Sequence, residues 1–214
     1  MPRRIDRDAR KAQLAEAVWR IIVERGIGAV SVRTVAEQAS VAVGSLRHVF
    51  PTRAELLEFS AELMVQRARE RILATPPSED PQQYALEVVK HLLPLEPDSR
   101  AELEVDIALI AESPALPELV AIRDHAHQQL GEACTRLVEL LAGRARDRQV
   151  EQDARRLHAI VDGLAIHLLR QSPPEDSGWA IEIVRDELAR IARTGERAGR
   201  QGSGPGPTHG TSPL

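Results

Sequence analysis

His158 and Asp162 lie four residues apart, a spacing that places both side chains on one face of a helix. An imidazole held by a carboxylate is half of a catalytic relay, but no nucleophile in a recognisable motif accompanies this pair. We therefore expect a polar pair beside a pocket or an interface, and we assign no catalytic residue. His125 and His127 are two positions apart and point in different directions on a helix, so they predict no metal pair. The single cysteine, Cys134, excludes an intramolecular disulfide and a multi-cysteine zinc site, and we expect neither a metal nor a cofactor.

Two further carboxylates, Glu102 and Asp106, are also four residues apart and share one face of a predicted helix. They either belong to a solvated surface or place one carboxylate in a cavity, where it would meet a cationic or hydroxylated ligand. The candidate ligand-binding residues are therefore Glu102, Asp106, His158 and Asp162.

The stretch SVAVGSLRHVF, residues 40–50, forms a short predicted helix with an apolar side and a polar side. The apolar side consists of Val41, Leu46, Val49 and Phe50, and the polar side carries Gly44, Ser45, Arg47 and His48. Glycine costs about 1 kcal/mol relative to alanine inside a helix, so its presence needs a reason. A helix without a Cβ at that position can approach a partner closely, and short polar groups beside an arginine suit the major groove of DNA.

The elements around this stretch have the pattern of a helix-turn-helix. Apolar spacing predicts a first helix over residues 8–25 and a second from residue 31, with a turn at Ser40–Val41 before the short helix. Ala36 is small enough for the helices to cross closely, and Ser40 stands where the turn needs a positive φ. The charge pattern agrees, because residues 1–55 are net basic whereas the rest of the chain is net acidic.

The segment VRTVAEQASVAVGSLRHVFPTRAELL resembles the DNA-binding domain of the TetR family of transcriptional regulators. It departs from the family pattern at Ser40, where glycine is usual, and at Arg47, where an aromatic residue is usual. The resemblance implies groove contacts from the short helix and a contact from the helix before it, with phosphate contacts from Arg47 and from the start of the next helix. The DNA-binding residues so implied are Arg33, Val43, Gly44, Ser45, Arg47, His48, Thr52 and Arg53.

The rest of the chain is predicted to be all-α as well, with about nine helices in total. Aromatic residues number only five, and alanine, leucine, valine and isoleucine supply the apolar content, which is typical of a helical bundle. Proline, glycine and capping residues delimit helices at about 53–73, 81–93, 99–112, 117–143, 151–170 and 178–193. We expect a DNA-binding domain over 1–55, a ligand-binding and dimerisation domain over 56–193, and a disordered Gly/Pro/Ser-rich tail over 194–214.

Apolar stripes mark the last two predicted helices. In the resembled family these helices form a four-helix dimer interface, and Gly163 would let two helices approach closely. The interface residues implied are Leu157, Val161, Leu164, Leu168, Ile181, Val184 and Leu188. The alternative is that both stripes face only the core of the subunit itself.

These features lead us to expect a dimeric, ligand-responsive regulator, most often a repressor in this family, that leaves a palindromic operator when a small molecule binds. The alternative is a DNA-bound regulator whose C-terminal domain takes a protein partner and no small ligand. A closed apolar cavity within residues 81–170 would favour the first, and a filled bundle with an exposed apolar patch would favour the second. No enzyme is expected, and no stretch is apolar enough to span a membrane, so we expect a cytoplasmic protein.

Overall fold

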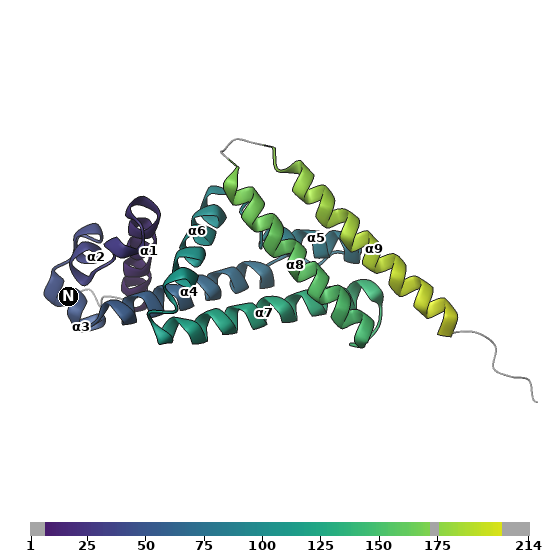
Figure 1. The fold of residues 1–214 in the computed structure, drawn as a ribbon, viewed down its shortest axis with the longest axis horizontal. Coiled ribbons are helices and arrows are strands. Elements are labelled where there is room, and N and C mark those ends of the chain that lie inside the picture. The colour runs from purple at the N-terminus through teal and green to yellow at the C-terminus, as the bar shows by residue number, and fades with distance from the viewer. Residues whose placement is uncertain (1–6, 172–175, 203–214) are drawn as a thin grey trace, which may run out of the picture.

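The computed structural model describes residues 7–171 and 176–202, which form nine α-helices and no strand (Figure 1). The first four helices are α1 (Arg7–Arg25), α2 (Val32–Gln38), α3 (Val43–Val49) and α4 (Arg53–Leu73). The others are α5 (Pro81–Lys90), α6 (Pro97–Glu112), α7 (Pro117–Ala142), α8 (Arg148–Arg170) and α9 (Gly178–Gly202). A short 3-10 helix, Ile27–Ala29, joins α1 to α2 and was not expected. The all-α prediction is confirmed.

Local chemistry explains where the helices begin and end. Gly26 directly after α1 has a positive φ of 78°, and Gly143 directly after α7 has a φ of 62° in the left-handed helical conformation that ends many helices. Ser31 and Thr34 form a capping box at the start of α2. Asp80 caps α5, whose first residue is a proline. These local signals are why the expected helix boundaries, apart from the end of the last helix, lie within a few residues of the observed ones.

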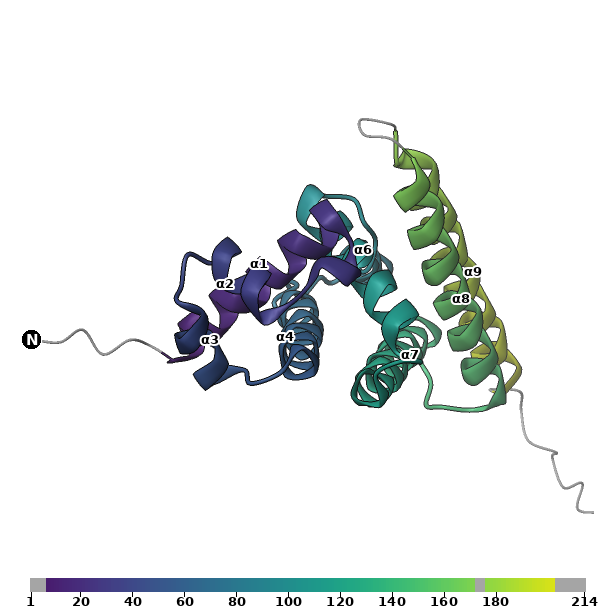
Figure 2. The same ribbon diagram turned by 60° about the vertical axis from the view of Figure 1, so that its left-hand side comes forward.

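The helices form a small head and a larger body. Helices α1 to α3 form the head, α4 and α7 run through the middle of the molecule, and α8 and α9 lie side by side at the far end (Figures 1 and 2). The head core joins apolar residues of α1 to α4 with Val105 and Leu109 of α6. The body core gathers apolar residues from α5, α7, α8 and α9. Helix α6 therefore packs against the head although it follows α3 by almost fifty residues.

The expected dimer stripes face inward. The sequence assigned Leu157, Val161, Leu164, Leu168, Ile181, Val184 and Leu188 to a dimer interface. In the structure six of these residues are at most 6% exposed and belong to the body core, and the seventh, Ile181, packs against that core. These residues pack within the core of the subunit itself, because α5 and α7 cover the apolar side of α8 and α9.

Helix α9 extends beyond its expected end. Disorder was predicted from residue 194, but the helix continues to Gly202. A Cβ at Gly195 would lie 2.5 Å from the Cα and O atoms of Ala142, so the glycine allows α9 to cross the end of α7 in direct contact. Glycine-rich composition was therefore a sign of close helix packing at this position. Residues 203–214 of the expected tail lie outside the described residues.

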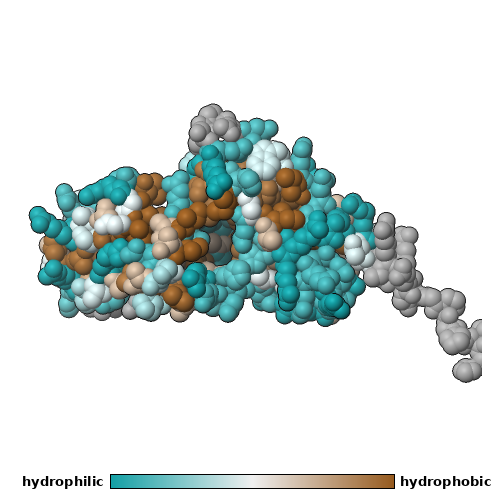
Figure 3. All heavy atoms as spheres, viewed as in Figure 1, coloured by the Kyte–Doolittle hydropathy of each residue, from teal (hydrophilic) through white to brown (hydrophobic). Residues whose placement is uncertain are grey.

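Hydrophilic residues cover most of the face in Figure 3, and the apolar residues on it form separate clusters around a hollow in the middle. The large apolar side chains exposed within the described residues are Val23, Val43, Leu73, Ile110, Leu140, Ile166 and Ile183. None of the described helices combines the length and apolar character that a membrane span requires.

Candidate functional site

Helix α3 presents its polar side to solvent and buries its apolar side. Val43, Gly44, Ser45, Arg47 and His48 are all exposed. The apolar anchors Leu46 and Phe50 are 1% and 5% exposed and belong to the head core. Because the anchors fix the rotation of this short helix, its polar side forms an outward surface at the end of the molecule.

The turn before α3 has the backbone expected from the sequence. Ser40 has a φ of 54°, and it is the one residue other than glycine with a positive φ within the described ranges. Its neighbour Val41 donates its N–H to the carbonyl of Ala36 at 2.9 Å, which closes the turn on the small residue of α2. The prediction of a strained turn residue at Ser40 is confirmed, and the strain serves to direct α3 across α2.

Two arginines beside this surface are free to meet phosphate. Arg33 of α2 and Arg47 of α3 are both exposed, and neither takes part in an ion pair within the described chain. Thr52 is exposed too, but its hydroxyl oxygen accepts the N–H of Glu55 and its hydroxyl proton faces the Glu55 carboxylate at 3.1 Å. Thr52 is thus first a helix cap, and a phosphate contact would require its hydroxyl to turn away from Glu55.

Arg53 has a different role from the phosphate contact that the resemblance implied. Its Nε donates to the carbonyl of Val30 at 3.0 Å and its Nη2 donates to the carbonyl of Ile27 at 3.2 Å. Its Nη1 forms an ion pair of 2.8 Å with Glu112 at the end of α6. The guanidinium therefore ties the start of α4 to the α1–α2 connection and to α6, and it is not free for a phosphate in this conformation.

The fold itself does not require a glycine at the position of Gly44. A Cβ built at this position meets no atom within 4 Å, and the residue is helical with a negative φ. The structure therefore supplies no internal reason for a residue that costs about 1 kcal/mol in a helix. A close approach by a partner outside the chain is the remaining physical reason, and it falls at the centre of the polar side of α3.

The candidate ligand-binding residues separate into two places. Glu102 forms a bidentate pair with Arg71 of α4 and lines an open cleft of about 830 Å³. Helices α1, α4, α5 and α6 enclose this cleft, so it lies between head and body. Trp19 of α1 also lines the cleft, and the Cζ atom of Arg67 lies over its ring at 5.1 Å from the ring centroid. The sequence did not single out this tryptophan or this arginine, because the cleft exists only where α1 meets α4.

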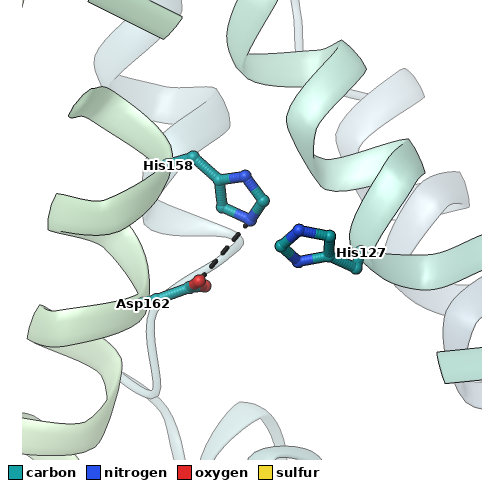
Figure 4. Close-up of side chains that lie close together, drawn as sticks. All are labelled: His127, His158 and Asp162. Carbon is teal, nitrogen blue, oxygen red and sulfur yellow. Dashed lines mark ion pairs between the residues drawn. The ribbon is translucent and has the colours of Figure 1, made fainter. Parts of the chain in front are cut away.

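The other candidates gather where α6, α7 and α8 meet, with His158 buried, Asp106 half-buried and Asp162 exposed. His158 Nε2 lies 3.5 Å from Asp162 Oδ2, so the expected His–Asp pair is present, and the ring of His127 on α7 lies 4.7 Å from that of His158 (Figure 4). Burial, followed by the charge of Asp162, raises the pKa of Asp106 to about 6. Burial lowers the pKa of His158. The charge of Asp162 acts against this lowering, and the charge of His127 adds to it. His127 was not among the candidates because spacing within one helix carries no information about a partner on another.

One apolar pocket in the expected ligand-binding region is far smaller than a ligand. A small apolar pocket of about 20 Å³ lies beside Asp106, between α4, α6 and α7. It is too small for anything larger than a water molecule. Cys134 nearby is buried and its thiol pKa is raised to about 12, so it is a core residue rather than a nucleophile.

A recognition helix held outward by buried anchors, on an all-helical body, defines a helix-turn-helix DNA-binding protein. Residues 14–58 match the model of the bacterial regulatory proteins of the tetR family, and residues 81–193 match that of the BetI-type transcriptional repressor C-terminal domain. The chain is 33% identical to the HTH-type transcriptional regulator PksA of Bacillus subtilis (strain 168), over 89% of this chain and 90% of that protein. The chain therefore belongs to the TetR family of DNA-binding transcriptional regulators, a role that is not enzymatic.

Solved structures show the same fold. A transcriptional regulator from Rhodococcus sp. Rha1 superimposes with a TM-score of 0.75 at 24% identity, over 86% of this chain and 96% of that chain. The multidrug binding protein EbrR, in complex with imidazole, superimposes with a TM-score of 0.59 at 27% identity, over 89% of this chain and 93% of that chain. Both cover the head and the body together.

Proposed function

We propose that this regulator is a dimeric repressor that leaves a palindromic operator when a small molecule binds. The observation that carries the DNA-reading half of this proposal is the exposed side of α3, where Gly44, Ser45 and His48 lie beside Arg47. Arg33 of α2 is also exposed, and neither arginine forms an ion pair within the described residues. Short polar groups read base edges in the major groove, while arginines neutralise phosphates. The operator of a bacterial regulator lies in the cytoplasm, and the proposal places the protein there.

The dimer forms through the outward faces of α8 and α9. Their inward stripes are already buried, which leaves Ala159, Gly163, Ile166 and Ile183 exposed on the other side. A Cβ at Gly163 would meet no atom within 4 Å, so a helix of a second subunit has room to approach there. A two-fold dimer places the two α3 helices one DNA turn apart, roughly 34–36 Å, or a multiple of that spacing.

The effector occupies the cleft between head and body. Its volume of about 830 Å³ suits a drug-sized molecule, and it combines the Trp19 ring with acidic and basic groups of α4 and α6. A molecule bound there touches α1 of the head and Glu102 of the body together, so its binding energy depends on how the two parts are placed. EbrR is a multidrug binding protein solved in complexes with imidazole and with malachite green, and the likeness to it supports a small-molecule effector.

A protein partner is the second candidate, and the small size of the apolar pocket beside Asp106 favours it. The two candidates predict different results when small molecules are screened by thermal shift in the presence and absence of operator. An effector raises the melting temperature more without operator than with it, because ligand and DNA then prefer different states. If no small molecule has this effect, the partner proposal stands in its place.

Operator selection from random duplexes, followed by fluorescence anisotropy, tests the DNA-reading role. Ser45→Ala and His48→Ala should change which sequence is selected, and Arg47→Ala should weaken binding to every sequence. Arg136→Ala serves as the matched control, because Arg136 is an exposed arginine on α7 and belongs neither to the α3 surface nor to the proposed dimer face. Equal loss of affinity in the Arg47 and Arg136 variants would contradict the assigned surface.

A further inference from the structure

Three side chains from two helices direct metal-ligating atoms at one point in the body. His127 comes from α7, and His158 and Asp162 come from successive turns of α8 (Figure 4). One ligating atom of each residue lies within 4.8 Å of the other two. Among the described residues, this is the one place where three histidine, cysteine or carboxylate side chains meet in this way.

The imidazole of His158 lacks a hydrogen bond at the atom that faces this point. His158 is 9% exposed, and its Nε2 atom is buried without a hydrogen-bond partner in the described chain. At 3.5 Å, Asp162 Oδ2 is an ionic neighbour rather than a hydrogen-bond acceptor for it. A buried polar atom without a partner is costly, so the arrangement favours a species that binds Nε2, Asp162 and His127 together.

The cluster of His127, His158 and Asp162 is buried on the side of His158 and open to solvent on the side of the other two residues. His127 is exposed, and the Asp162 side chain retains 56% of its accessible surface. Ligating atoms on a tetrahedral ion with bonds of about 2.0–2.2 Å lie about 3.3–3.6 Å apart. The 3.5 Å between His158 Nε2 and Asp162 Oδ2 falls in this range, whereas the ligating atom of the exposed His127, within 4.8 Å of both, would move inward when an ion binds.

We propose that His127, His158 and Asp162 bind one divalent transition-metal ion of the zinc type. Two imidazoles and one carboxylate are a donor set that suits Zn²⁺, Co²⁺ and Ni²⁺, whereas Mg²⁺ and Ca²⁺ require mostly oxygen ligands. Solvent access through His127 and Asp162 leaves the remaining coordination position to water or to a donor atom of another molecule. Since α7 and α8 each contribute ligands, the ion also joins these two helices across the body.

The rival interpretation is a stacked histidine pair with an exposed carboxylate beside it and no metal. Both interpretations place the same side chains together, so only metal binding itself separates them. The matched controls lie on the same two helices: His125 is exposed on α7 two residues from His127, and His167 is exposed on α8. His125 is hydrogen-bonded to Gln129 and is not part of the cluster.

The test uses the untagged full chain, freed of metal with a chelator and then dialysed. Co²⁺ is added while the visible absorption is recorded, because tetrahedral Co²⁺ bound to nitrogen and oxygen ligands gives a strong d–d band. We expect one Co²⁺ per chain and displacement of the band by Zn²⁺. His127→Gln and Asp162→Asn should each weaken Co²⁺ binding by at least about tenfold. Replacing residues that only hydrogen-bond to metal ligands already weakens binding about 10–100-fold.

His125→Gln and His167→Gln should bind Co²⁺ as the unaltered chain does. Zn²⁺ should raise the melting temperature of the unaltered chain and of these controls, but not of the two cluster variants. Binding that persists in both cluster variants, that is lost equally in the controls, or that is absent from the unaltered chain would overturn the proposal. None of these measurements involves DNA, so they succeed or fail independently of the proposed operator binding.

Discussion

Arg53 at the start of α4 and Glu112 at the end of α6 form an ion pair of 2.8 Å that joins the DNA-reading head to the body. The two side chains keep 32% and 24% of their accessible surface, so the pair is partly shielded from solvent. Arg53 also holds the carbonyls of Ile27 and Val30. Any change that moves the end of α6 thereby acts on the loop that carries α2, which is a direct physical route from body to head.

Arg53 and Arg47 should consequently respond differently to replacement by alanine. Arg53→Ala leaves Glu112 and two carbonyls without their donor, so we expect a loss of about 2–3 kcal/mol in the free energy of unfolding. Arg47→Ala should leave stability within about 0.5 kcal/mol of the unaltered chain and should reduce the salt dependence of DNA binding by about one phosphate contact. Urea unfolding and anisotropy at several salt concentrations measure the two effects. If Arg53→Ala also made DNA binding less dependent on salt concentration, Arg53 would contact a phosphate after all.

Gly44→Ala separates folding from DNA binding. The new methyl group meets no atom of the chain, and alanine is the better helix former, so stability should rise by up to about 1 kcal/mol. DNA affinity should fall in the same variant, because the methyl group points where α3 approaches the groove. Alanine at Gly195 is the informative comparison, since that position is in contact with backbone. If Gly44→Ala bound operator as tightly as the unaltered chain, Gly44 would have no part in the DNA surface.

Gly195→Ala should destabilise the protein although it places a better helix former in α9. A Cβ there would lie 2.5 Å from the backbone of Ala142, which cannot yield as a flexible side chain would. We expect a loss of about 1–3 kcal/mol, observed as a lower urea midpoint. An unchanged or higher midpoint would mean that α9 does not cross the end of α7 as closely as described.

Substitutions on the two sides of α8 and α9 should have opposite consequences. Ile166→Glu and Ile183→Glu add charge to exposed positions, so they should give folded monomers that lose specific DNA binding. Leu164→Glu and Leu188→Glu would bury a charge in the body core, so they should unfold the chain instead. Analytical ultracentrifugation together with circular dichroism distinguishes a folded monomer from an unfolded one. Intact dimers in both isoleucine variants would exclude the outward face as the interface.

Asp106 should make stability depend on pH in a defined direction. Its folded pKa of about 6 lies above the ordinary value of 3.8, so the folded chain binds more protons between these values, and stability falls as the pH rises through this window. Asp106→Asn removes the cost of the buried charge and should raise the free energy of unfolding at pH 7 by up to about 3 kcal/mol. This gain should vanish near pH 4. Asp186→Asn, an exposed carboxylate on α9, is the control. Unfolding is measured in chelator, and a gain independent of pH would contradict the assigned shift.

The sequence by itself determined the features that depend on neighbouring residues. Gly26, Ser31 and Asp80 mark helix ends through backbone conformation and capping, which are local properties. The DNA-binding head was predictable for the same reason, because its turn at Ser40 and its anchors Leu46 and Phe50 lie within a short segment. The apolar stripes of the last two helices were also readable from their periodicity.

Only the tertiary structure decided what each of these faces meets. Periodicity shows which side of α8 is apolar, but α5 and α7 of the same subunit, rather than a second subunit, cover that side. The partner of Arg53 is Glu112, 59 residues away, and the neighbour of His158 is His127 on another helix. Gly195 of α9 lies against the backbone of Ala142 in α7. The physical reason is the same in each case: a helix crossing brings together residues whose separation along the chain carries no periodic signal, so their contact energies appear only once the helices are packed.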